Sequence, residues 1–172
     1  MWVKYFDMQT NPNIFIDCNR AKANLKAVFE DQRFSDVTFR PHFKTHQSIG
    51  AGMWFRNSGI EKITVSSLPM AEYFAAGGWN DILIAMPLNP NHIAQYNALA
   101  SKIKLHLLVD NNDTLTKALS EIKNPVSFYL KADAGYGRAG WPAENTKEFL
   151  RAFKLISKNG THPFSGILSH FG

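Results

Sequence analysis

The sequence predicts an α/β fold of the (β/α)8 barrel type, of which the chain supplies about six strands. Short apolar segments alternate with segments of helical period, and the strands begin about every twenty to twenty-six residues until a longer gap precedes the last. Most of these segments are apolar nearly throughout, as expected for parallel strands that are covered on both faces.

Six segments are predicted to be barrel strands, and a short run at Ile14–Asp17 precedes them. The six are Val37–Lys44, Ile63–Leu68, Asp81–Met86, Lys104–Val109, Val126–Lys131 and Phe164–Ser169. An open doubly wound sheet is the competing architecture. Its Gly-rich phosphate fingerprint is absent from the first βα turn, and DAGYGRAG spaces its glycines differently. We therefore expect residues 1–172 to be one domain, the first three quarters of a barrel, with two unpaired edges.

Helical periodicity fills the intervals between these strands. Apolar residues at i, i+3, i+4 and i+7 predict one helix over Leu115–Ile122, after the capping candidates Asn112 and Asp113, and another over Phe149–Ile156. A further helix is expected after Asn19. Both kinds of element therefore follow the order of βα units.

Composition limits the classes of function. With 45 % hydrophobic residues in 172, the chain has enough apolar material for a core. Its net charge of +5 is spread along the chain, which argues against a nucleic-acid groove. The single Cys18 excludes an internal disulfide, the first residues lack a signal-type apolar run, and no stretch approaches the roughly twenty apolar residues of a membrane span. A cytoplasmic protein is expected.

Polar clusters follow three of the predicted strands. PHFKTH comes at the end of the first strand, KADAGYGR after the fifth and SHFG after the sixth. The reactive face of a parallel α/β fold lies beyond the carboxyl ends of its strands. The three clusters are therefore predicted to converge on one site.

Lys44 is the first candidate for chemistry. It lies between His42 and His46 at the end of an apolar strand, where desolvation and neighbouring positive charge would lower its pKa and free its amine as a Schiff-base nucleophile. Two other interpretations stay open: Lys44 extends to water from a strand end, or His42 and His46, with His170, bind a metal in a hydrolase. On a strand-to-loop segment the two histidines would not share one helical face, which weakens the metal interpretation.

A resemblance to a known family adds to this pattern. RPHFKTH followed by ITVSSLPMAEYFAAGGWNDILIAMP resembles the signature of the D-threonine aldolase and D-serine dehydratase group, within the alanine racemase N-terminal-domain superfamily. NIFIDCNRAKANL and SGILSHFG extend the match over nearly the whole chain. The resemblance implies a pyridoxal-phosphate (PLP) enzyme on a (β/α)8 barrel, an aldolase, dehydratase or racemase that forms a carbanion at Cα of a D-amino acid.

The resemblance also implies roles for particular residues. Lys44 matches the lysine that forms the Schiff base with PLP and acts as a base at Cα. Arg138 matches an arginine near the cofactor's phenolic oxygen, and His170 matches a histidine that packs on the pyridine ring. Lys131 matches a lysine of alanine racemases that aldolase-type members often replace with an acid, so the subtype stays open.

The other two candidate histidines, His42 and His46, are expected to bind at the edge of the cofactor near Lys44. An anionic, phosphorylated cofactor would give the four basic groups of RPHFKTH a shared function, with Arg40 and Pro41 fixing the strand end.

The sequence departs from the family after residue 172. Members continue with two more strands that hold the cofactor phosphate, and with a C-terminal β domain that supplies the second base or, in some, metal ligands. A metal is therefore expected only in that region and none in residues 1–172. We expect either a fragment of a longer enzyme or a chain that completes its barrel by association, for example as a homodimer. The alternative is a non-catalytic barrel segment or a PLP-binding module without activity.

Overall fold

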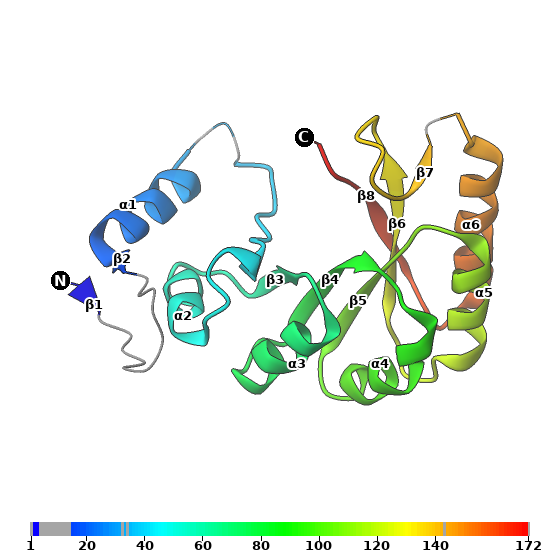
Figure 1. Ribbon diagram of the computed structural model, residues 1–172, viewed down its shortest axis with the longest axis horizontal. Helices are drawn as coiled ribbons and strands as arrows, with labels where there is room; N and C mark the ends of the chain where they lie inside the picture. The colour runs from blue at the N-terminus through cyan, green and yellow to red at the C-terminus, as the bar shows by residue number, and fades with distance from the viewer. Residues whose placement is uncertain (1, 4–14, 32, 34, 143, 172) are drawn as a thin grey trace.

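A curved sheet of parallel strands forms the centre of the computed structural model (Figure 1), which describes residues 2, 3, 15–31, 33, 35–142 and 144–171. The strands are β3 (Lys62–Val65), β4 (Asp81–Pro87), β5 (Lys104–Val109), β6 (Ser127–Asp133) and β8 (Phe164–Ser169). They follow one another in the order of the chain, and the short β7 (Trp141–Pro142) pairs with the end of β6. This is the arrangement of successive βα units, so the predicted fold class is confirmed.

The central strands are buried on both faces. All residues of β5 from Leu105 to Val109 are buried, and so are Ile82 and Ile84 of β4. Ile63, Ile82 and Leu105 lie in register across three neighbouring strands. These side chains belong to one hydrophobic core that reaches from Phe43 to Ile156, which explains why the strands read as apolar almost without interruption.

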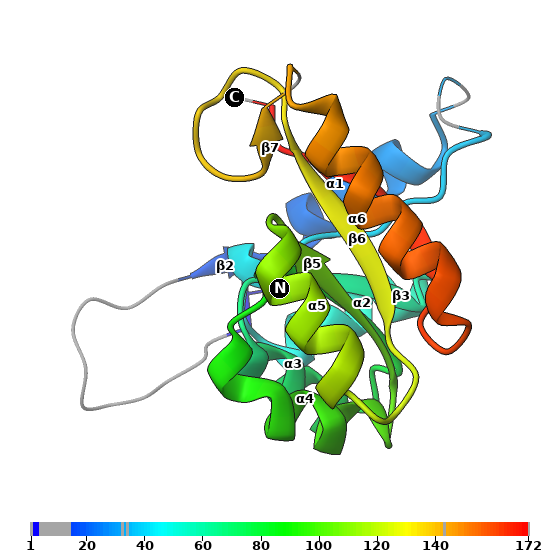
Figure 2. The same cartoon turned by 90° about the vertical axis from the view of Figure 1, so that its right-hand side faces the viewer.

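Four helices lie along the outer side of the sheet (Figures 1 and 2). They are α3 (Leu68–Ala76), α4 (Ile93–Ala100), α5 (Asn112–Glu121) and α6 (Thr146–Asn159). The remaining helical elements are α1 (Cys18–Phe29), α2 (Ile49–Asn57) and the 3₁₀ turns η2 (Phe43–Thr45) and η3 (Pro90–His92). The helices cover the outer face of the sheet, so the polar groups on its inner face are the ones that can form a site.

Capping residues set where two of these helices begin. The predicted strand Ile63–Leu68 is too long, because Ser67 caps α3 by accepting a hydrogen bond from the Met70 N–H at 3.3 Å. The cap of α5 is Asn111, which accepts from the Thr114 N–H at 2.8 Å, rather than the predicted Asn112 or Asp113. Helix α1 begins at Cys18, two residues before the first position after Asn19.

The first predicted strand is where the structure differs most. Of Val37–Lys44, only His42 forms a bridge, to Thr64, and the Thr64 N–H donates to the Pro41 carbonyl at 2.8 Å. Within the described residues this segment has a neighbour on one side alone, and Val37 is 61 % exposed. The chain leaves strand geometry after His42, because His42 caps η2 by accepting a hydrogen bond from the Lys44 N–H at 3.3 Å, and Lys44 therefore falls in this turn.

The barrel is accordingly incomplete. Among the residues that the structure describes, no strand connects β8 to residues 37–42, so the sheet remains open at both edges. The N-terminal run predicted at Ile14–Asp17 is outside the described residues at its first position. Its last two residues form β2 (Ile16–Asp17), which pairs antiparallel with β1 (Trp2–Val3). No helix in the described ranges is long and apolar enough to cross a membrane.

Candidate active site

A cavity of about 640 Å³ opens at the carboxyl ends of the strands. Its wall contains residues from the ends of β3, β4, β5, β6 and β8, together with the segment before η2 and the loop after β6. This is the face on which parallel α/β folds carry their reactive groups. The cavity is therefore the first place to look for the candidate residues.

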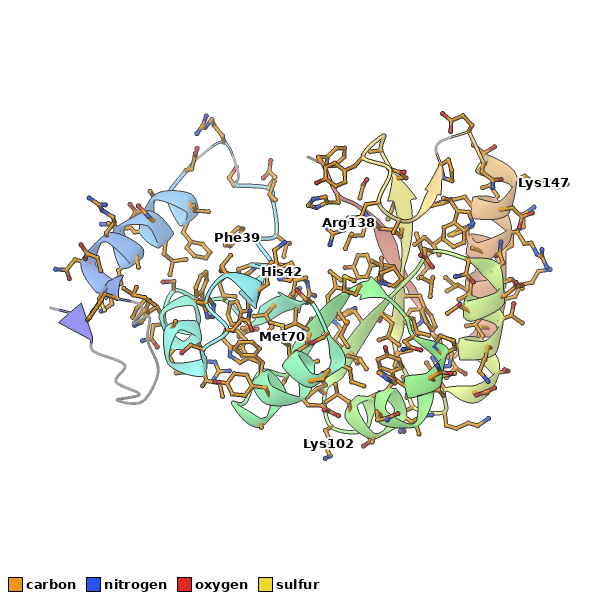
Figure 3. All side chains as sticks on the ribbon, viewed as in Figure 1. Phe39, His42, Met70, Lys102, Arg138 and Lys147 are labelled. Carbon is orange, nitrogen blue, oxygen red and sulfur yellow. The ribbon has the colours of Figure 1, made fainter. Side chains whose placement is uncertain are left out.

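Five of the six candidates line this cavity. They are His42, Lys44, Lys131, Arg138 and His170. Figure 3 shows two of them, His42 before η2 and Arg138 in the loop after β6, on either side of the opening. The structure thus brings together three segments that are far apart in the sequence. His46 is not among the lining residues.

Lys44 lies in η2, and its side chain is exposed. The sequence predicted a desolvated lysine on a strand, and the structure differs because the strand stops at the His42 bridge. The turn is held by the Lys44 backbone N–H, which donates to His42 Nδ1 at 3.3 Å. Lys44 is therefore placed at the mouth of the cavity by its neighbour rather than buried in the barrel wall.

The two neighbouring histidines have different surroundings. Burial, and then the positive charge of Lys44, lowers the pKa of His42, which suits an imidazole that accepts a hydrogen bond through Nδ1. His46 stacks on Phe55 at 5.5 Å and contacts Phe43 at 4.4 Å, and burial lowers its pKa as well. His46 points into an aromatic cluster, so His42 and His46 are not directed toward a common metal ion.

These two shifts predict a pH dependence of stability. A lowered histidine pKa means that the unfolded chain binds more protons below the usual value of about 6.5. The free energy of unfolding should therefore fall as pH drops from about 6.5 through the folded-state pKa values of His42 and His46. Urea unfolding between pH 7.5 and 5 measures this. The dependence of the unfolding free energy on pH should be weaker in a His42→Gln, His46→Gln double variant than in the unchanged chain, and should persist in His92→Gln. An equal pH dependence in the unchanged chain and in both variants would contradict the assignment.

The loop after β6 places Arg138 and covers Lys131. Asp133 accepts hydrogen bonds from the N–H groups of Gly135 and Gly137, each at 3.1 Å, and so fixes the start of the loop. Gly140 then brings the chain back against β6: a Cβ at this position would lie 2.7 Å from Lys131 Cγ. Lys131 itself is only 6 % exposed.

His170 completes the far side of the cavity. It follows β8 directly, and its ring meets the exposed Tyr136 ring edge to face, with 4.9 Å between centroids. Tyr136 comes from the same loop as Arg138, so the loop after β6 and the end of β8 support each other.

A partly buried ion-pair network around Asp81 was not foreseen from the sequence. Asp81 Oδ1 accepts from Arg40 Nη2 at 2.6 Å and lies 3.0 Å from His106 Nε2, while Lys104 Nζ is 3.4 Å from Oδ2. Burial alone would raise the pKa of Asp81, but hydrogen bonds from His106 and Arg40 and the charge of Arg40 hold it well below its usual range. The available signal was His106, a polar residue inside the apolar strand KLHLLV.

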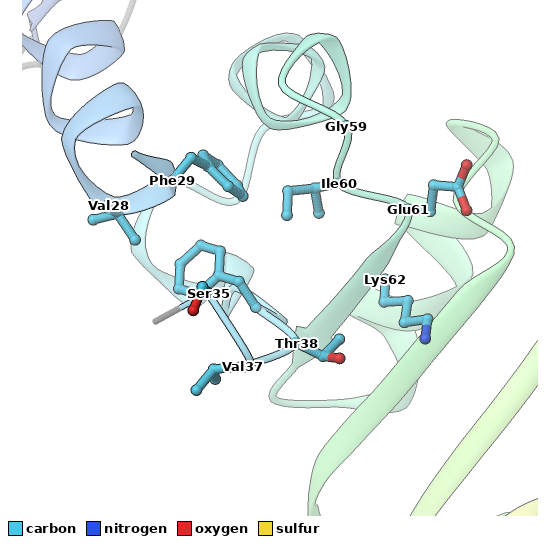
Figure 4. Close-up of a pocket in the computed structure, with 10 residues that line it drawn as sticks. Val28, Phe29, Ser35, Val37, Thr38, Gly59, Ile60, Glu61 and Lys62 are labelled. Atoms are coloured by element: carbon cyan, nitrogen blue, oxygen red, sulfur yellow. The ribbon is translucent and has the colours of Figure 1, made fainter. Parts of the chain in front are cut away.

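A second hollow of similar size, about 630 Å³, lies between α1 and the residues that lead into β3 (Figure 4). Val28 and Phe29 of α1, Val37 and Ile60 form its apolar part, and Glu61 is its acidic group. It contains none of the six candidate residues. The two hollows therefore differ in the residues that line them, although their volumes are nearly equal.

Comparison with known proteins identifies the family of the chain. The sequence profile described as "Alanine racemase, N-terminal domain" matches residues 16–172, which is most of the chain. The chain belongs to the alanine racemase N-terminal domain family. Members of this family depend on PLP.

The chain is also similar to individual curated proteins and to a solved structure. It is 28 % identical over 94 % of its length to D-threo-3-hydroxyaspartate dehydratase of Delftia sp. (strain HT23) and 33 % identical over 79 % to D-serine dehydratase of Dictyostelium discoideum. The solved structure of the Delftia enzyme superposes on 90 % of the chain with a TM-score of 0.81 at 27 % identity. The chain spans 43 % and 38 % of the lengths of these two curated relatives.

Proposed function

We propose that the chain is the N-terminal portion of a PLP-dependent enzyme that acts on a D-amino acid, by elimination or aldol cleavage at Cα. The relatives named as D-threo-3-hydroxyaspartate dehydratase, D-serine dehydratase and D-threonine aldolase support the substrate class and the reaction type. The observation that carries the proposal is the cavity that gathers Lys44, Lys131, Arg138 and the two histidines His42 and His170.

The charge of the cavity fits a phosphorylated aldehyde. Among the described residues that line it are four cationic side chains and two imidazoles but no carboxylate. Only Arg40 has its charge matched, by Asp81 at 2.6 Å. Lys44, Lys131 and Arg138 have no hydrogen-bond or ion-pair acceptor within the described ranges, so an anionic ligand would supply one.

Each residue has a distinct task in this proposal. When bound, PLP supplies a conjugated ring that withdraws electrons from Cα of the substrate. The Lys44 amine would hold the PLP aldehyde and, once the substrate amine has displaced it, would accept the proton that leaves Cα in an elimination. Arg138 offers planar N–H donors to an oxygen anion, and His170 presents an imidazole face held by Tyr136.

His42 acts on this chemistry indirectly. By accepting the Lys44 N–H, it fixes the turn from which the amine extends. Its lowered pKa favours the neutral imidazole, which accepts through Nδ1 when its proton is on Nε2. His46 has no place at the cofactor in this proposal because it packs against Phe55, outside the cavity.

Covalent labelling tests the proposal. The purified chain is mixed with PLP, reduced with borohydride and mapped by mass spectrometry. We expect a visible absorption band and a label concentrated on Lys44, both lost in Lys44→Ala, whereas Lys154→Ala, a change on the exposed face of α6, leaves both in place. The fold of Lys44→Ala is checked by circular dichroism.

The non-catalytic alternative predicts a different pattern. If the chain is a barrel segment that retains the motif without the activity, label will spread over exposed lysines in proportion to their accessibility. That distribution would be the same in Lys44→Ala, apart from the missing site. Such a result would reject Lys44 as the reactive lysine.

A further inference from the structure

Gln47, directly after the end of η2, has a backbone conformation that no other non-glycine residue in the described part of the chain adopts. Its φ is +45°. A left-handed conformation costs free energy in a residue that carries a Cβ, and it persists only where the surrounding structure imposes it. Gln47 is three residues from Lys44, so the contacts that impose its conformation bear on the candidate reactive lysine.

Both sequence neighbours of Gln47 are fixed. The His46 ring stacks on Phe55, with 5.5 Å between centroids, and His46 Nδ1 accepts a hydrogen bond from the Ser48 N–H at 3.2 Å. Ser48 caps α2 by accepting from the Ala51 N–H at 3.4 Å. The chain must therefore pass from η2 into α2 within a single residue, and Gln47 takes the left-handed conformation that this passage requires.

In this conformation Gln47 binds back onto η2. Its backbone N–H donates to the Phe43 carbonyl at 3.0 Å, and its side-chain Nε2 donates to the Lys44 carbonyl at 3.2 Å. The Lys44 N–H donates to His42 Nδ1 at 3.3 Å. Both polar backbone groups of Lys44 are thus held by neighbouring side chains, His42 before it and Gln47 after it, while its own side chain is exposed.

Phe43 anchors the same turn from the hydrophobic core. Its side chain is 0 % exposed and contacts Phe74 and Trp79, each with 5.0 Å between centroids. Phe43 therefore fixes where the chain enters Lys44, and Gln47 fixes how the Lys44 carbonyl is oriented. An amine that extends from one backbone orientation loses less entropy when it reaches its reaction partner.

We propose that Gln47 is a positioning residue for Lys44, because its side-chain amide fixes the peptide plane next to the carbon from which the amine extends. The proposal rests on the proposed function, in which Lys44 is the reactive amine. It gives Gln47 no contact with the cofactor.

Gln47→Met removes the donor and keeps the length of the side chain. The Thr45 N–H shares a peptide plane with the Lys44 carbonyl, and its order parameter from ¹⁵N relaxation without PLP should fall from about 0.85 to below about 0.6. The rate of PLP labelling at Lys44 should fall by about threefold to tenfold, as expected for one lost hydrogen bond. Gln47→Arg, whose guanidinium can donate to the same carbonyl, should restore both values. Gln95→Met, a change at an exposed position of α4, should alter neither.

Gln47→Gly separates positioning from stability. Glycine relieves the left-handed strain, so urea unfolding should show this variant to be at least as stable as Gln47→Met. The Thr45 order parameter and the labelling of Lys44 should nevertheless be as low as in Gln47→Met. Labelling that instead follows stability across the variants would show a structural role alone and overturn the proposal.

Two further results would make the proposal wrong. One is an unchanged Thr45 order parameter in Gln47→Met, and the other is a lowered order parameter with an unchanged labelling rate. If label does not concentrate on Lys44 in the unchanged chain, the proposed function is rejected instead. The order parameter, which is measured without PLP, then decides whether Gln47 fixes the turn.

Discussion

Gly140→Ala is expected to destabilise the protein by about 3 kcal/mol, from backbone strain and a steric clash together. Gly140 has φ +109°, a conformation that alanine adopts only at a cost. The new Cβ would also lie 2.6 Å from the Lys131 carbonyl oxygen and 2.9 Å from its carbonyl carbon, distances that real Cβ atoms essentially never show. The loop cannot simply lift away, because the next residue, Trp141, is buried against Phe149.

Gly135→Ala is the matched control for this prediction. Gly135 lies in the same loop with φ +94°, but a Cβ there has no atom within 4 Å. It should therefore cost only the backbone strain, about 1–2 kcal/mol. Urea unfolding at pH 7.5 measures both variants. Equal losses would mean that the close approach of Gly140 to β6 is not needed, and that Arg138 reaches the cavity without it.

Much of the fold could be predicted from residue patterns within short segments of the sequence. Parallel strands covered on both faces must be apolar, so β4, β5 and β6 were recognisable from DILIAMP, KLHLLV and the run before Asp133. The clusters after them were predicted to converge because parallel strands end at one face. The cavity lined by Lys44, Arg138 and His170 agrees with that reasoning.

The first strand was harder to predict because its structure depends on a partner. Val37–Lys44 has the composition of a strand, but the described residues pair it with β3 at His42 alone, and the chain turns into η2 directly afterwards. Local sequence cannot report how many neighbours a segment will have. The same limit explains the exposed position of Lys44.

The directions in which individual side chains point could not be predicted from the sequence either. His42 and His46 are equally polar and are four residues apart, yet one faces the cavity and the other packs against Phe55. The turn η2 between them determines the difference. The ion pair between Arg40 and Asp81, which are 41 positions apart, could not be predicted either, because a contact between distant segments produces no periodic pattern in the local sequence.

Asp81→Asn should have the second large effect, a loss of about 3 kcal/mol of unfolding free energy at pH 7.5. The variant leaves Arg40 without its countercharge in a place where the Arg40 and Asp81 side chains are 15 % and 14 % exposed. His106, only 4 % exposed, would lose the same acceptor charge. The lowered pKa of Asp81 implies that this stability is fully present above the usual aspartate range and is lost only as pH falls through the folded-state value.

The surface pair Lys117 and Glu121 provides the control, since both side chains are 47 % exposed. Glu121→Gln should cost no more than about 0.5 kcal/mol, because solvent screens an exposed pair. Arg40 also donates to the Ile63 carbonyl at 3.1 Å, so it ties the segment before η2 to β3 and β4 at once. Releasing Arg40 should therefore loosen the turn that carries Lys44, and PLP labelling of Lys44 should fall in Asp81→Asn but not in Glu121→Gln. If both variants were equally stable and equally labelled, the ion pair would not be what positions Lys44, and the His42 bridge to Thr64 would have to hold the segment alone.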